Sequence, residues 1–197
     1  METENVLLAV LGGLVAFAGV TALALCFITV PPVTRDAVVR VDMKNGGVGS
    51  GVHIGHGLVI TAAHVVDKAE NIQIDRKPAE VLWANAGYDL AAVRTETNGP
   101  AAQLRCTEPE IGEQLTAYGH PAGLSRTRTQ GHVAGKTGVV ERWRAVFAAD
   151  LTVFFGNSGG PAFDSHGQVA AIVVGILQGS GFSFLVPGSE VCRMLGR

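Results

Sequence analysis

Two patterns of apolar residues divide the chain. Residues 6–30 form an uncharged run of 25 positions, longer than the roughly 20 apolar residues that a helix needs to cross a bilayer. Pro31 and Pro32 follow and would end such a helix, because proline lacks an N–H group and restricts the residue before it. The pattern predicts a transmembrane anchor in residues 1–32 and a separate domain in residues 33–197.

Two other interpretations of the first segment are weaker. A cleaved signal peptide begins with basic residues and has a shorter apolar core, whereas residues 1–5 contain no base. A buried core helix is disfavoured because the segment is apolar on every side. The orientation stays open, because Arg35, Arg40 and Lys44 follow the span and the positive-inside rule would place them in the cytoplasm.

From residue 33 onward, short apolar or alternating runs lie between glycines. Such spacing is typical of all-β barrels or sandwiches. The expected strands are 37–41, 51–54, 58–61, 71–74, 80–83, 90–94, 114–118, 132–140, 145–148, 168–176 and 182–186. A helical pattern occurs only at 62–66 and 189–195, and the polar stretch 95–112 predicts a connection between two halves.

Composition narrows the class of protein. Hydrophobic residues make up 47% of the 197 positions and charged residues 16%, which excludes an intrinsically disordered chain. Glu2 and Glu4 are the only charged residues in the first 30, so the remainder carries 15 acids and 15 bases. That balance offers no basic surface, and we expect no nucleic-acid partner.

The cysteines and histidines suggest neither a metal site nor a disulfide scaffold. Three cysteines are too few for a four-cysteine zinc site. Cys106 and Cys192 are expected to be buried thiols, with a disulfide as the alternative. His53 and His56 lie three apart without a third ligand nearby, so we expect no metal and no other cofactor. The histidines in polar or glycine-flanked turns are expected at the surface: His120, His132 and His166.

The segment 155–161, Phe-Gly-Asn-Ser-Gly-Gly-Pro, is the strongest candidate for chemistry. Glycines accept backbone angles that other residues resist, so a tight turn can expose Ser158. Such a turn can also direct N–H groups at one point, as the oxyanion of acyl transfer requires. A plain glycine turn in a hairpin is the alternative for this segment taken alone.

A serine hydroxyl is a weak nucleophile and requires a nearby base. His64 follows an apolar run and two small alanines, so it can sit at a strand end facing a cleft. A core histidine is the alternative. Asp89 opens another apolar run and can orient the base from a buried position. Asp67 lies near His64 in sequence but is expected to be solvated or to cap the turn.

Together these segments resemble the trypsin-like, chymotrypsin-fold serine proteases. The resemblance rests on Gly49-Ser50-Gly51, Thr61-Ala62-Ala63-His64, Asp89-Leu90-Ala91 and Gly156-Asn157-Ser158-Gly159-Gly160-Pro161, in that fold's order of His, Asp and Ser. Further segments resemble the HtrA/Deg branch of these proteases: Tyr118-Gly119-His120-Pro121-Ala122-Gly123-Leu124-Ser125, Thr129-x-Gly131-x-Val133 and Phe182-Ser183-Phe184-Leu185-Val186-Pro187.

The resemblance implies two six-stranded antiparallel β-barrels, about 33–98 and 112–188, with the active site in the cleft between them. Ser158 would attack the scissile carbonyl, His64 would move the proton, and Asp89 would orient the imidazole. The N–H groups of Gly156 and Ser158 would form the oxyanion hole. Asn157 replaces the aspartate of digestive trypsins, so we expect no zymogen cleavage. We expect the branch's usual C-terminal PDZ domain to be absent, because the resemblance to the protease domain extends to about residue 195.

The resemblance also suggests how substrates bind. Thr152 would lie near the base of the specificity pocket, and Ile172, Val173 and Val174 would form the strand that pairs with substrate. An apolar pocket would favour cleavage of polypeptides after small or medium aliphatic residues.

The function expected from these features is that of a membrane-anchored serine endopeptidase. Its protease domain is expected to be periplasmic or extracellular, with the cytoplasmic side as the alternative, and a homo-oligomer is possible. The alternatives in function are a protease-fold binding or scaffold module with little turnover, and a processing enzyme of a phage or virus.

Overall fold

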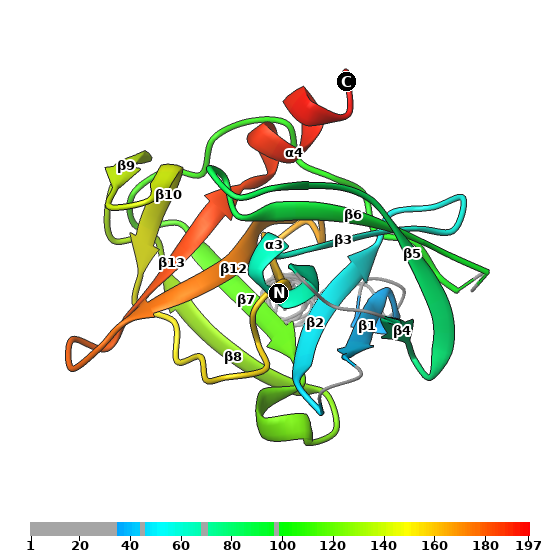
Figure 1. The fold of residues 1–197 in the computed structure, drawn as a ribbon. Helices are drawn as coiled ribbons and strands as arrows, with labels where there is room; N and C mark the ends of the chain where they lie inside the picture. The colour runs from blue at the N-terminus through cyan, green and yellow to red at the C-terminus, as the bar shows by residue number, and fades with distance from the viewer. Residues whose placement is uncertain (1–34, 44–45, 68–70, 97–98) are drawn as a thin grey trace, which may run out of the picture.

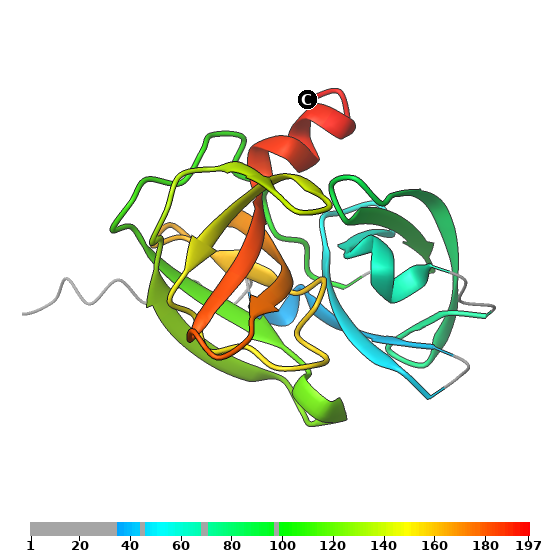
Figure 2. The ribbon, with the colours of Figure 1, turned by 60° about the vertical axis from the view of Figure 1, so that its left-hand side comes forward.

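The chain folds into two β-sheet halves that lie side by side, as Figures 1 and 2 show in two views. The structure is a computed structural model that describes residues 35–43, 46–67, 71–96 and 99–197. Helical structure in these residues is limited to short segments, among them α3 (Ala63–Val66) and α4 (Gly188–Met194). Both coincide closely with the two helical patterns in the sequence, and the all-β prediction is confirmed.

The first half is a closed barrel with the strand order β1-β2-β3-β6-β5-β4. Its interior is filled by side chains, as expected for a barrel of this size; Val59, Ile60 and Val93 are fully buried. The prediction of a six-stranded barrel is confirmed for this half. Its strands are β1 (Val38–Asp42), β2 (Val48–His53), β3 (Leu58–Thr61), β4 (Gln73–Ile74), β5 (Lys77–Asn85) and β6 (Leu90–Thr95).

The second half is a sheet of seven strands in the order β8-β7-β11-β12-β13-β10-β9. An antiparallel bridge between Val133 and Ala149 brings the chain just after β8 to β10, so the sheet curls back on itself. This half therefore differs from the predicted six-stranded barrel by the additional strand β9. Its strands are β7 (Gln114–Gly119), β8 (Thr127–His132), β9 (Gly138–Val140), β10 (Trp143–Ala149), β11 (Pro161–Phe163), β12 (Val169–Leu177) and β13 (Phe182–Pro187).

Two strands of this sheet were not expected, and one expected strand is wrong. The segment 132–140 is not a single strand but contains the end of β8 and all of β9. Strand β8 consists of polar residues and one glycine, so its pairing with β7 left no hydrophobic pattern in the sequence. Strand β11 has three residues and begins with a proline, which normally argues against an inner strand.

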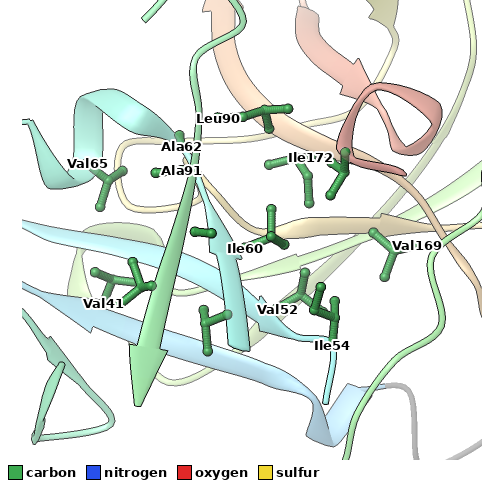
Figure 3. Packing of buried hydrophobic residues seen from close by; sticks show 14 of the residues in the cluster. Val41, Val52, Ile54, Ile60, Ala62, Val65, Leu90, Ala91, Val169 and Ile172 are labelled. Atoms are coloured by element: carbon green, nitrogen blue, oxygen red, sulfur yellow. The ribbon is translucent and has the colours of Figure 1, made fainter. Parts of the chain in front are cut away.

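A single hydrophobic core crosses the boundary between the halves. Val169 and Ile172 of β12 pack with Val52 and Ile60 of the first barrel (Figure 3). A second core lies inside the seven-stranded sheet and includes Val173. Strand β12 is buried on both faces from Val169 to Val174, because it contributes side chains to both cores.

The connection between the halves is covalently attached to the C-terminal helix. Cys106 and Cys192 form a disulfide, with their Cα atoms 5.6 Å apart. The expectation of two buried thiols was wrong. The error has a physical reason: backbone hydrogen bonds pair 103–105 with Val169 of β12, and β12 leads through β13 to α4. The two cysteines are 86 residues apart in the sequence, so no local pattern indicated that they meet.

The predicted membrane span, residues 6–30, lies outside the described residues. Within the part of the chain that the structure describes, no helix combines the length and the apolarity needed to traverse a bilayer.

Loss of the disulfide should lower the free energy of unfolding by about 2–4 kcal/mol, because the bond restricts a long loop of the unfolded chain. Urea denaturation of the Cys106→Ser/Cys192→Ser double variant tests this. A reductant should lower the free energy of unfolding of the parent protein by the same amount and should leave that of the double variant unchanged. Equal stability of parent and variant would show that the bond contributes nothing.

Candidate active site

His64 and Asp89 form a hydrogen-bonded pair at one end of the first barrel. The His64 Nδ1 atom lies 2.7 Å from Asp89 Oδ2, and the backbone N–H of His64 donates to Asp89 Oδ1 at 2.9 Å. The Asp89 side chain is 5% exposed and that of His64 40%. A buried carboxylate therefore holds an imidazole whose other nitrogen remains available toward solvent.

The local sequence explains how this pair is positioned. Strand β3 leads through the buried Ala62 and Ala63 into α3, and the Ala63 N–H donates to the Asp89 carbonyl at 3.1 Å. Asp89 has a left-handed backbone with φ of 52°, which aspartate tolerates better than most residues. The preceding turn is closed by Asn85, whose side-chain oxygen accepts N–H bonds from Gly87 and Tyr88.

The charge of Asp89 is maintained although the group is buried. Burial raises the pKa of this carboxyl. The hydrogen bonds from His64 and Trp143, together with the nearby His64 charge, lower the pKa by more than burial raises it, so it lies below its ordinary value. The charged form is therefore the stable form at neutral pH. A charged carboxylate is what an imidazole needs in order to stabilise the imidazolium.

Ser158 lies in a tight turn between the two halves. The turn is closed by Asn157 N–H to the Phe154 carbonyl at 3.0 Å and by Gly160 N–H to the Asn157 carbonyl at 2.9 Å. Gly159 has φ of +83°, and a Cβ there would collide with Thr61 and with the Ser50 carbonyl. Only glycine fits at this position, so the turn can approach the first barrel closely.

The same turn orients the Gly156 N–H away from Ala122. The Phe155 carbonyl accepts a hydrogen bond from the Ala122 N–H at 2.7 Å. Because a trans peptide places its C=O and N–H on opposite sides, the Gly156 N–H points the other way. Within the described residues, the N–H groups of Gly156 and Ser158 donate no hydrogen bond. Neither donor therefore has an acceptor among the described residues.

A pocket of about 290 Å³ contains both His64 and Ser158. Its remaining lining is mostly apolar and comes from the segment before Ser158 and from β12: Val153, Phe154, Phe155, Val173, Val174, Gly175 and Ile176, with Trp143 and Arg142 at one side. Of the expected substrate-binding residues, Val173 and Val174 line it. Thr152 does not line it, and Ile172 is fully buried because its side chain enters the shared core.

Ser50, whose role the sequence did not reveal, supports the Ser158 turn from the first barrel. Its hydroxyl donates to the Gly156 carbonyl at 2.7 Å and accepts from the His120 N–H at 2.9 Å. Its backbone N–H donates to the Ser158 carbonyl at 2.8 Å. His120, expected at the surface, is instead buried, and burial lowers the pKa of its imidazole.

A two-part β fold that places a serine, a histidine and an aspartate around a cleft is that of a trypsin-like peptidase. The model of the family described as "Trypsin-like peptidase domain" matches residues 49–172. This match covers more than half of the chain, so the chain belongs to that family.

The relatives include HtrA-type proteases, which confirms the resemblance to that branch. "Putative serine protease HhoA" of Synechocystis is 30% identical over 163 residues, covering 74% of this chain and 41% of that protein. "Periplasmic pH-dependent serine endoprotease DegQ" of Escherichia coli is 29% identical over 168 residues, covering 77% and 37%.

A solved structure of the same fold is the active form of the Rv3671c protease from M. tuberculosis. It has a TM-score of 0.74 and 25% identity, covering 84% of this chain and 83% of that chain. By contrast, the chain spans about a third to two fifths of the length of the curated relatives it matches.

Replacing Ser50 with alanine should lower the free energy of unfolding by about 1–3 kcal/mol, because a buried N–H and a buried carbonyl lose their partner. Chemical denaturation measures the change. Ser165→Ala, at an exposed serine, is the matched control and should stay within about 0.5 kcal/mol of the parent. Equal effects of the two variants would rule out the supporting role of Ser50.

Proposed function

We propose that this chain is a serine endopeptidase in which Ser158, His64 and Asp89 form the catalytic triad. The observation that carries the proposal is the short His64–Asp89 hydrogen bond beside a pocket that His64 shares with Ser158. Membership of the trypsin-like peptidase family supports the same chemistry.

In the proposed mechanism, the Ser158 hydroxyl attacks the scissile carbonyl carbon while His64 accepts the hydroxyl proton. The resulting oxyanion receives hydrogen bonds from the N–H groups of Gly156 and Ser158. Collapse of the tetrahedral species breaks the C–N bond, and His64 returns the proton to the leaving amine. Water, activated by His64 in the same way, then hydrolyses the acyl-enzyme and restores Ser158.

The pocket supports cleavage after small or medium aliphatic residues. Val153, Val173 and Val174 contribute aliphatic surface, and no carboxylate is among the residues that line it. An arginine or lysine side chain would therefore be buried there without a charged partner, which is unfavourable. Arg142 at the side of the pocket adds to the repulsion of a basic side chain.

We place the protease domain outside the cytoplasm, attached through residues 6–30. The Cys106–Cys192 disulfide supports this location, since such bonds persist mainly in oxidising compartments. Relatives described as periplasmic agree with it. Arg35, Arg40 and Lys44 favour the cytoplasmic side, but the disulfide and the periplasmic relatives outweigh them in this proposal.

Labelling of the full chain with a fluorophosphonate tests the triad. The parent protein should become labelled, Ser158→Ala should not, and His64→Ala should slow the reaction by roughly 10⁴-fold or more. Ser165→Ala should react like the parent. Absence of labelling in folded parent protein would contradict the proposal and favour the binding or scaffold module.

Peptides that differ only at the residue before the scissile bond test the pocket. A valine peptide should be cleaved at least about 10-fold faster than an arginine peptide, because only valine avoids burying a charge. The ratio of kcat/KM values measures the preference. Faster cleavage of the arginine peptide would overturn the assignment of an aliphatic pocket.

A further inference from the structure

Within the described residues, one side chain of the second half donates a hydrogen bond to the His64–Asp89 pair, and it is that of Trp143. Its indole Nε1–H donates to Asp89 Oδ2 at 3.2 Å in a buried position. Asp89 Oδ2 is also the atom that lies 2.7 Å from His64 Nδ1. One carboxylate oxygen is thus shared by an imidazole from the first barrel and an indole from the second half.

The indole is held in place by its neighbours. A Cβ on Gly175 would lie 2.6 Å from the far edge of the Trp143 ring, so β12 approaches the ring closely. The Phe184 ring lies 5.4 Å away, and the Arg142 guanidinium lies 5.0 Å from the indole centroid. Such packing leaves the Trp143 N–H little freedom to point anywhere other than at Asp89.

The backbone beside Trp143 is docked to the same turn. The Arg144 N–H donates to the Gly87 carbonyl at 2.8 Å, two residues before Asp89. Strand β10 therefore begins against the turn that carries the carboxylate. This second contact makes the placement of the indole over Asp89 independent of the single side-chain hydrogen bond.

We propose that Trp143 is a positioning residue that fixes the Asp89 carboxylate and thereby the orientation of His64. The inference rests on the proposed function, because it concerns the support of the proposed triad. Oδ1 is held by the His64 backbone N–H, and Trp143 holds Oδ2. Without the indole N–H, both remaining side-chain hydrogen bonds of the carboxylate would come from His64, so no group outside His64 would fix the position of Oδ2.

The shared oxygen has a further consequence for acid–base behaviour. A neutral donor on Oδ2 withdraws part of the negative charge that would otherwise stabilise the imidazolium. Loss of that donor should therefore favour the protonated imidazole and move the acid side of the activity profile to higher pH. The other charged groups facing the pair are Asp67 and Arg142, which line the adjoining pocket, and Arg144 at Gly87.

The test removes the N–H group and leaves the ring. Trp83 is the other tryptophan of the chain, and it lies on β5, where it pairs with Ala92. In the full-length Trp83→Phe protein, tryptophan is replaced biosynthetically by benzothienylalanine, in which sulfur occupies the N–H position. The matched control carries 5-fluorotryptophan, which keeps the N–H. The readouts are fluorophosphonate labelling against pH and the proton NMR signal of His64 Nδ1–H.

The proposal predicts that benzothienylalanine lowers the maximal labelling rate about 10-fold, with little change in half-saturating probe concentration. The acid limb should move to higher pH, and the His64 proton should shift downfield. The 5-fluorotryptophan protein should match its parent. Identical rates, pH profiles and NMR signals for the two analogues would overturn the role of Trp143. If the parent itself fails to label, the proposed function fails, and the NMR signal still decides the role of Trp143.

Discussion

The packing of β12 against the first barrel is the interaction on which the rest of the molecule depends. Val169 and Ile172 enter a core shared with Ile60 and Leu90, while Val173 enters the core of the second sheet. Each large side chain buried in this way contributes roughly 1.5–3 kcal/mol. Since the same strand contributes to both cores, apolar packing alone already holds the two halves together.

That packing matters because the candidate site is divided between the halves. His64 and Asp89 belong to the first barrel, whereas Ser158 and its turn belong to the second half. Apolar packing is not directional and leaves small shifts possible. Hydrogen bonds across the boundary remove that freedom: Ser50 holds the Ser158 turn, and Trp143 holds Asp89. The hydrophobic core brings the halves together, and these polar contacts determine their final alignment.

The parts of the fold that the sequence predicts are those with a local signal. Residues around Ser158, His64 and Asp89 were identifiable because glycines, alanines and apolar runs flank them within a few positions. Strand β8 had no such signal, because its own side chains form no apolar pattern and it is a strand through its backbone pairing with β7. The Cys106–Cys192 bond, the burial of His120 and the contact of Trp143 with Asp89 all join segments far apart in sequence. No spacing rule relates such segments, so they emerge only from the three-dimensional structure.

The two aromatic residues beside the nucleophile have a thermodynamic consequence. Phe154 and Phe155 are 64% and 80% exposed, so the pocket that they line presents a large apolar area to water. A polypeptide that covers them releases that water, and burial of apolar surface gives binding a negative change in heat capacity. Under the proposed function, binding of a polypeptide should therefore weaken on cooling, as hydrophobic association does, and the two exposed phenylalanine rings keep at the surface part of the driving force that folding uses elsewhere.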